Sequence, residues 1–147
     1  MQVTKDTSAG ALILVVEDVH ETRYGMEKLL IADGYRVSLA RDEAEAIDNA
    51  QLRRPDLILV SVGGSPNDVI MSAARVRGKA CVGDAVPLVI FCLDGIEEGE
   101  EVAIGQNVHL TRPDNFNQLR RLLSRVLGNV SDPTRSSPPT PEKGRSQ

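Results

Sequence analysis

The sequence has few aromatic residues: among 147 residues there is no tryptophan, and phenylalanine and tyrosine occur twice each. Proteins that bind single-stranded nucleic acid stack bases on aromatic side chains, so this composition argues against such a platform. The sequence also lacks a basic stripe, and its net charge is −4 with neutral histidines. An acidic chain of this kind repels phosphate backbones. We therefore expect no direct binding of nucleic acid.

Cysteine is scarce as well: Cys81 and Cys92 are the only two, and neither stands at a spacing typical of metal sites or redox pairs. Both are expected to be free thiols in a reducing compartment. The first apolar run, residues 11–16, is too short for the core of a signal peptide, and no apolar run reaches the length of a membrane span. These features predict a cytoplasmic protein without a membrane partner.

Motifs of nucleotide-dependent and nucleophilic enzymes are missing too. The sequence has no P-loop pattern, no G-x-G-x-x-G after a predicted strand, and no nucleophile with a visible base nearby. It therefore predicts that the chain is not an enzyme.

What the chain does contain is one ordered alternation of apolar runs and amphipathic segments. Residues 1–10 are polar and lack periodicity, so they are expected to form a flexible leader. Residues 11–128 carry the alternation, and their length suits one domain. Residues 129–147 are rich in Ser, Pro and charge, which predicts a disordered tail.

Short apolar runs bounded by turn residues predict strands that are covered on both faces. Segments with apolar residues at helical spacing separate these runs. The alternation indicates an α/β domain with a parallel sheet. The expected strands are 12–16, 35–40, 57–60, 87–92 and 108–111, and the expected helices begin near His20, Asp42 and Ser65, with a last helix at 117–127 that Gly128 ends.

The second helix carries a recognisable start. Asp42 is the expected N-cap, and Glu45 three positions later completes a capping-box pattern. Its inward face is expected to consist of Ala44, Ile47 and Leu52.

The segment 97–101 holds four glutamates around Gly99. Acidic residues in a first turn suit the helix dipole, so we expect a short helix here that ends at Gly105. Gly99 weakens such a helix by ~1 kcal/mol relative to alanine. The acidic run has two interpretations, a docking surface for a basic partner or a solvated helix start.

Four spaced stretches carry a family resemblance. They are Ile13-Leu14-Val15-Val16-Glu17-Asp18, Pro55-Asp56-Leu57-Ile58-Leu59-Val60, Val86-Pro87-Leu88-Val89-Ile90 and Thr111-Arg112-Pro113. In this order and spacing the chain resembles the receiver domain of two-component response regulators, over about residues 11–128. The resemblance implies a flavodoxin-like (CheY-like) doubly wound sheet of five parallel strands, with strand order 2-1-3-4-5 and helices on both faces.

The resemblance also implies a chemistry. Receivers accept a phosphoryl group from a histidine kinase on an aspartate that ends the third strand, with Mg²⁺ held by two acids after the first strand. Matched position by position, the acidic pair is Glu17 and Asp18, so a weak Mg²⁺ site is one interpretation of them. The other is an inherited acidic rim that pairs with Arg112. Two carboxylates without a third oxygen ligand hold Mg²⁺ weakly.

The remaining active positions depart from the family. Ser61 takes the phosphoacceptor position, and an alcohol needs an activating base where a carboxylate does not. The switch positions hold Cys92 in place of a hydroxyl, His109 in place of an aromatic ring and Arg112 in place of lysine. Cys92 is either a redox-sensitive thiol or a small buried residue, and His109 either a pH switch or a strand histidine.

These departures lead to an expected function. We expect a stand-alone, degenerate receiver (a pseudo-receiver) that signals through protein–protein contact without phosphorylation, by way of the helices beside the fourth and fifth strands. Its partner would be a histidine kinase or another signalling protein, and a homodimer is an open alternative. Two rival hypotheses are a phosphorylation-responsive receiver with a substitute acceptor, and a small-molecule or metal-binding module that uses the strand-end crevice.

Overall fold

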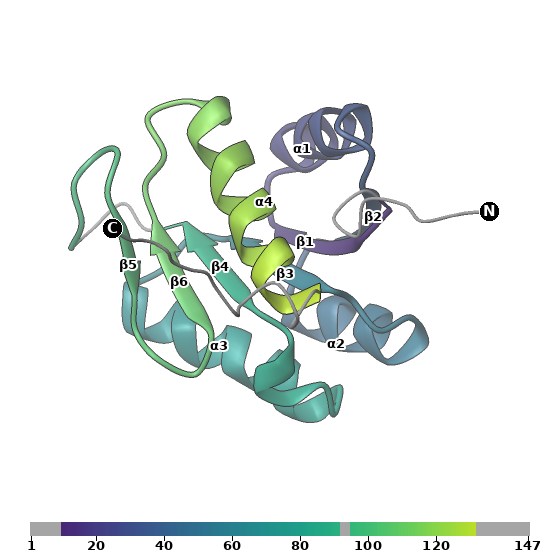
Figure 1. The fold of residues 1–147 in the computed structure, drawn as a ribbon. Helices are drawn as coiled ribbons and strands as arrows, with labels where there is room; N and C mark the ends of the chain where they lie inside the picture. The colour runs from purple at the N-terminus through teal and green to yellow at the C-terminus, as the bar shows by residue number, and fades with distance from the viewer. Residues whose placement is uncertain (1–9, 92–94, 132–147) are drawn as a thin grey trace, which may run out of the picture.

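A computed structural model of the chain describes residues 10–91 and 95–131, without the side chains of 129–131. Its centre is a six-stranded sheet of order β2-β1-β3-β4-β6-β5 (Figure 1). The strands are β1 Leu12–Glu17, β2 Arg36–Ala40, β3 Leu57–Ser61, β4 Leu88–Phe91, β5 Glu101–Ala103 and β6 Val108–Thr111. The helices are α1 His20–Ala32, α2 Glu43–Leu52, α3 Pro66–Lys79 and α4 Phe116–Ser131, with a short 3-10 helix at Gly83–Ala85.

The parallel part of the sheet confirms the predicted topology. β1 pairs with both β2 and β3, β3 pairs with β4, and β4 pairs with β6, all in parallel. Counted along the chain, these five strands have the expected order 2-1-3-4-5. The sixth strand, β5, was not predicted, and it pairs antiparallel with β6 at the edge of the sheet.

Helices cover both faces of the sheet (Figure 1). α1 and α4 lie over one face, where the leucines of α4 meet the inward residues of β1 and β3. α2 and α3 lie over the other face, against Leu14, Ile58 and Ile90. Each fully buried leucine or isoleucine contributes roughly 2 kcal/mol of apolar burial, so these two layers supply most of the stability of the domain.

The inward face of α2 differs from the prediction. Ala46 and Ala50 are its buried residues, whereas Ala44 is exposed and Leu52 is 81% exposed. The small side chains of Ala46 and Ala50, four residues apart, lie closest to the sheet, and Ile47 packs partly buried against the same core, as predicted. The predicted N-cap is confirmed, because the Asp42 carboxylate accepts a hydrogen bond from the backbone N–H of Glu45 at 2.9 Å.

The helix predicted for the acidic run is wrong. After Gly99, whose φ is +87°, the chain enters β5 and returns along β6 as a hairpin. Gln106 and Asn107 have φ of +52° and +63°, and the Val108 N–H donates to the Gly105 carbonyl at 3.1 Å. With Ile104 paired to Val108, the loop of the hairpin is the three residues 105–107, all with positive φ. The fold therefore has an edge strand where a helix was expected.

The last helix continues to Ser131, three residues past the glycine that was expected to end it. The predicted leader, apart from Gly10, and the predicted tail from residue 132 onward lie outside the described residues. Within the described ranges, no helix is both long and apolar enough to cross a membrane.

Candidate functional site

The first half of the candidate site lies where β1 and β3 end. Glu17 is the last residue of β1 and Ser61 the last of β3, and the two are directly paired in the parallel register. Because parallel strands bring their carboxyl ends to one edge of the sheet, these residues meet although 44 positions separate them. The predicted grouping of Glu17, Asp18 and Ser61 is thus present in the fold.

Glu17 is buried, with only 3% of its surface exposed. Its carboxylate accepts a hydrogen bond from the backbone N–H of Val19 at 2.9 Å and another from the Ser61 hydroxyl. Burial raises the pKa of Glu17 above its ordinary value of 4.5, and the neighbouring Asp18 carboxyl adds to the rise. The hydrogen bonds from Val19 and Ser61 oppose the rise without cancelling it.

The start of α1 fixes the backbone around these acids. The Arg23 guanidinium donates from Nη1 to the Glu17 carbonyl oxygen at 2.7 Å, and its Nη2 lies 3.4 Å from the His20 ring. Asp18 itself is exposed. The two acids therefore have different surroundings, one buried and hydrogen-bonded and the other in solvent.

Mg²⁺ requires near-octahedral oxygen ligands, so its fit to these residues can be judged from the donors. Ser61 supplies a neutral hydroxyl, and it donates to Glu17. Burial also favours the protonated form of Glu17, which competes with a cation. Among the described residues no group of three or more His, Cys, Asp or Glu side chains could hold a metal. This donor set does not fit Mg²⁺.

The buried carboxyl leads to a prediction for Glu17→Gln. Because the folded-state pKa of Glu17 is raised, stability from this group is full below pH 4.5 and is lost as pH rises through the folded-state pKa. Glutamine resembles the protonated form, so the variant should gain about 1 kcal/mol in free energy of unfolding around neutral pH and nothing below pH 4.5. Urea unfolding across this pH range measures it, with exposed Glu21→Gln as the control. A loss of stability at neutral pH would show that the charge is favourable there.

The second half of the site lies at the ends of β4 and β6. Of the predicted switch residues, Cys92 lies outside the described residues. Arg112 follows β6, and its Nη1 donates to the Ile96 carbonyl at 3.3 Å, so it ties the start of the acidic segment to the sheet. The Arg112 backbone also bonds to Gly99 and Glu100.

His109 is half-buried in the middle of β6. Its Nε2 lies 3.3 Å from the Asn107 side-chain oxygen. Burial lowers its pKa, the Arg125 charge lowers it further, and the Glu101 carboxylate opposes both. A neutral ring packed beside α4 fits these surroundings, as expected for a strand histidine.

One polar residue of this region was missed by the sequence analysis. Thr111, the last residue of β6, is fully buried, and its Oγ1 has no hydrogen-bond partner in the described part of the structure. Thr111 pairs with Phe91 of β4 in the register. The only sequence signal for it was a hydroxyl residue at the end of an apolar strand.

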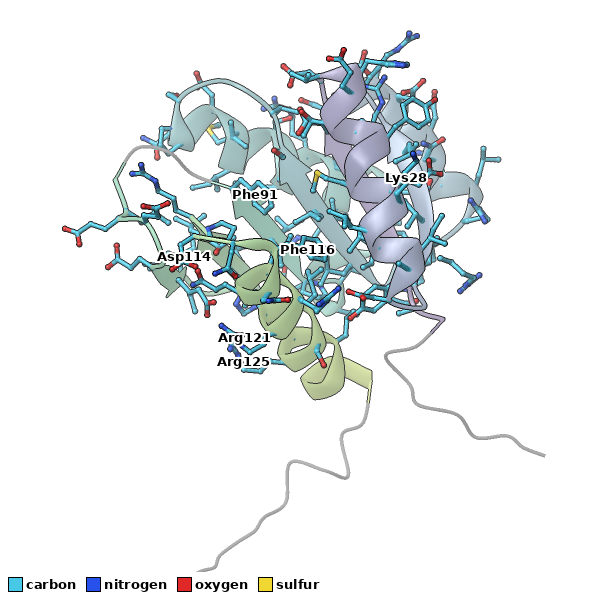
Figure 2. All side chains as sticks on the ribbon, turned by 90° about the horizontal axis from the view of Figure 1, so that it is seen from above. Lys28, Phe91, Asp114, Phe116, Arg121 and Arg125 are labelled. Atoms are coloured by element: carbon cyan, nitrogen blue, oxygen red, sulfur yellow. The ribbon has the colours of Figure 1, made fainter. Side chains whose placement is uncertain are left out.

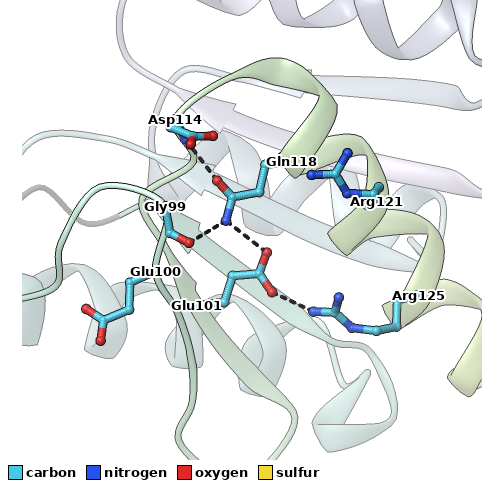
Figure 3. A pocket seen from close by; sticks show the side chains of 7 residues that line it. All are labelled: Gly99, Glu100, Glu101, Asp114, Gln118, Arg121 and Arg125. Atoms are coloured by element: carbon cyan, nitrogen blue, oxygen red, sulfur yellow. Dashed lines mark hydrogen bonds and ion pairs between the residues drawn. The ribbon is translucent and has the colours of Figure 1, made fainter.

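A pocket of about 580 Å³ lies between the hairpin and α4. Figure 3 shows its walls: Gly99 and Glu101 on one side, Gln118 and Arg125 on the other. The Gln118 amide donates to the Gly99 carbonyl at 2.7 Å, and Arg125 forms an ion pair with Glu101 at 2.7 Å. Figure 2 shows Arg121 and Arg125 on the same side of the molecule as Asp114, away from Lys28 of α1. The pocket is thus polar and lies apart from Ser61.

Comparisons with known proteins place this architecture. No protein-family model matches the sequence. The response regulator MprA of Mycobacterium tuberculosis is 34% identical over 87 residues, which are 58% of this chain and 36% of that protein. The transcriptional regulatory protein KdpE of Staphylococcus aureus is 26% identical over 119 residues, which are 78% of this chain and 50% of that protein. The chain therefore spans half or less of the length of these relatives.

One solved structure matches this chain over almost the whole of its own length. The receiver domain of the sensor histidine kinase PA1611 from Pseudomonas aeruginosa superposes with a TM-score of 0.60 and is 29% identical, over 82% of this chain and 99% of that domain. The chain has a CheY-like receiver fold. The PA1611 domain has a magnesium ion coordinated in its active-site cleft. In this chain Ser61 and the buried Glu17 lie at the ends of β3 and β1.

Proposed function

We propose that this receiver domain acts in two-component signalling through protein–protein contacts that do not depend on phosphorylation. The observation that carries the proposal is the direct pairing of Ser61 with the buried Glu17 at the end of β3. The position that the resemblance assigns to the phosphoacceptor aspartate holds an alcohol hydrogen-bonded to a neighbouring side chain. In this proposal the chain is not an enzyme, needs no cofactor and has a signalling protein, such as a histidine kinase, as its partner.

The surface for such contacts differs from the one expected from the sequence. No helix lies between β4 and β6 within the described residues, so a surface built on two helices is excluded there. The side of the domain beyond β6 instead presents the β5 edge, the acidic segment and the outer side of α4. The proposed partner contact therefore moves to this side.

Intact-mass measurement after incubation with acetyl phosphate and Mg²⁺ tests the proposal. The native chain is expected to gain no phosphoryl mass, because an alcohol is a weaker nucleophile than a carboxylate unless a base activates it. Ser61→Asp is expected to gain one phosphoryl group, since it supplies a carboxylate nucleophile and a third oxygen ligand for Mg²⁺. Ser61→Ala is the matched control, because it removes the hydroxyl and so shows whether any phosphoryl group is attached to it.

The proposal would be overturned if the native chain were phosphorylated and the Ser61→Ala variant were not. That result would support a second candidate function, a receiver with Ser61 as substitute acceptor. One observation favours that candidate: the Ser61 hydroxyl donates to the Glu17 carboxylate, which could take up its proton. The raised pKa of Glu17 gives it the proton affinity that such a base needs.

A further inference from the structure

The outer edge of the sheet has a defined hydrogen-bond pattern. The Ile104 N–H donates to the Val108 carbonyl at 3.0 Å, and the Arg112 N–H donates to the Glu100 carbonyl at 3.1 Å. In an antiparallel ladder the hydrogen-bonded pairs recur at every second residue. Val102 is therefore bonded to β6 as well, and the backbone groups of Glu101 and Ala103 point away from it.

These outward groups are unpaired. No other strand of the described sheet lies beyond β5, so the outward backbone groups of Glu101 and Ala103 have no partner strand there. An edge with free N–H and C=O groups is a template for an added strand. Recognition by strand addition takes its affinity from such backbone bonds and its specificity from the side chains on either side.

The two faces beside the edge offer different surroundings. On the α2/α3 side lie Val102, which is half-buried, and Ile104, which is 45% exposed. On the α4 side the edge borders the polar pocket of about 580 Å³, whose walls include Glu101 and Asp114 (Figure 3). Alternate side chains of an added strand would enter these two environments.

The charge around the edge is acidic. Glu97, Glu98, Glu100 and Asp114 are exposed and form no ion pair with any described residue, whereas Glu101 is neutralised by Arg125. Arg121 is the one wall residue of the pocket that adds an unpaired positive charge. A second copy of the chain would bring an equally acidic edge against this one. A basic partner avoids that repulsion.

We propose that the β5 edge binds an extended, basic segment of a partner protein as an added strand. The segment has free backbone groups at alternate residues, basic side chains near the acidic segment 97–100 and an apolar residue over Val102 and Ile104. This inference rests on the proposed function, since it gives the chemistry of the partner that the domain contacts.

The test uses three fluorescein-labelled hexapeptides as probes: alternating lysine and valine, alternating glutamate and valine, and alternating lysine and proline. Anisotropy titration with the full chain is expected to give binding of the lysine–valine peptide at least about tenfold tighter than of the other two. That affinity is expected to fall by about tenfold from low to high salt, because the charges involved are exposed. Equal binding of the three peptides would overturn the proposal.

Two pairs of variants locate the site. Ala103→Pro removes one outward donor and leaves the β6 bonds in place, so it should weaken binding about tenfold, whereas Ala103→Thr keeps the donor and the affinity. The charge-removing pair Glu97→Gln/Glu98→Gln should weaken binding several-fold. Glu21→Gln/Asp48→Asn removes the same charge elsewhere on the surface and should have little effect. Circular dichroism melting confirms that each variant folds.

Each contrary result has its own meaning. Unchanged binding by Ala103→Pro would place the peptide elsewhere and overturn the proposal. Sedimentation equilibrium that shows a dimer lost in Ala103→Pro would also overturn it, because a second copy would then be the occupant. Neither readout involves phosphoryl transfer, so both stay separate from the mass measurement that tests the proposed function.

Discussion

Replacing Arg77 of α3 by alanine should lower the free energy of unfolding by about 3 kcal/mol. Arg77 is only 4% exposed, and its Nη1 donates to two backbone carbonyls, Val86 at 3.0 Å and Gln106 at 2.8 Å. Its Nη2 lies 3.4 Å from the Asp84 carboxylate, which is largely in solvent. Alanine would leave both carbonyls without this donor and would remove the buried aliphatic stem.

Arg75, two residues earlier on the same helix, is the matched control. Its guanidinium makes two 2.8 Å bonds to the Glu43 carboxylate, which are shorter than the Arg77–Asp84 contact, but it is about half exposed. An exposed ion pair is screened by solvent and contributes little, so Arg75→Ala should cost much less than Arg77→Ala. Chemical denaturation gives the free energy of unfolding of both variants. The comparison shows whether burial of the arginine or the geometry of its ion pair matters more for stability. A larger loss for Arg75→Ala would contradict the prediction.

Thr111→Val should raise the free energy of unfolding by about 1–2 kcal/mol. The Thr111 hydroxyl is fully buried and lacks a described partner, so the fold bears its desolvation without a compensating hydrogen bond. Valine has nearly the same shape and replaces the hydroxyl by a methyl group. Thermal and urea unfolding measure the gain.

Thr111→Ser separates the two substituents of this side chain. Serine keeps the hydroxyl and loses the methyl group, so it should destabilise the domain by about 1 kcal/mol. If Thr111→Val is destabilising and Thr111→Ser is neutral, the hydroxyl has a favourable partner at the end of β6. Repeating the acetyl phosphate experiment in the Thr111→Val, Ser61→Asp double variant would then show whether that hydroxyl also assists the restored site.

The parallel part of the fold could be predicted because its signals are local and repeated. The strands 57–60 and 108–111 are continuous apolar runs, and Asp42 and Glu45 mark the start of α2 unambiguously. The alternation of strands and helices indicated a parallel sheet, whereas the strand order 2-1-3-4-5 came from the resemblance to receiver domains. The same resemblance grouped Glu17, Asp18 and Ser61, and the direct pairing of Glu17 with Ser61 was first seen in the structure.

What could not be predicted depends on tertiary context. Helix-dipole reasoning favoured a helix at 97–101, but a hairpin forms because Gly99, Gln106 and Asn107 adopt positive φ and Val102 pairs with β6. Gln106 gives no turn signal of its own, since non-glycine residues rarely adopt positive φ. The sequence analysis assigned no role to Arg77, because the carbonyls that it binds come from positions 9 and 29 residues away.

The sequence predicted where the candidate site lies, but it did not predict the burial and hydrogen bonding of its residues. The sequence placed Glu17, Asp18 and Ser61 together, and the structure has them at adjoining strand ends. It gave no sign that Glu17 would be buried or that Ser61 would donate to it, because burial depends on how α1 closes over the strand end. The prediction for Cys92 lies outside the described residues and stays a prediction.

The β5–β6 hairpin also bears on how the domain folds. Every other strand pair in the described sheet is parallel and must wait for a crossover segment to close, whereas this hairpin closes through the three residues 105–107. Isolated hairpins form in about 1–10 μs, and distant parallel pairing is slower because loop closure precedes any gain. The edge can therefore form early, before β6 docks on β4. During that interval its free strand is a point at which newly made chains can be captured, by a partner or by one another.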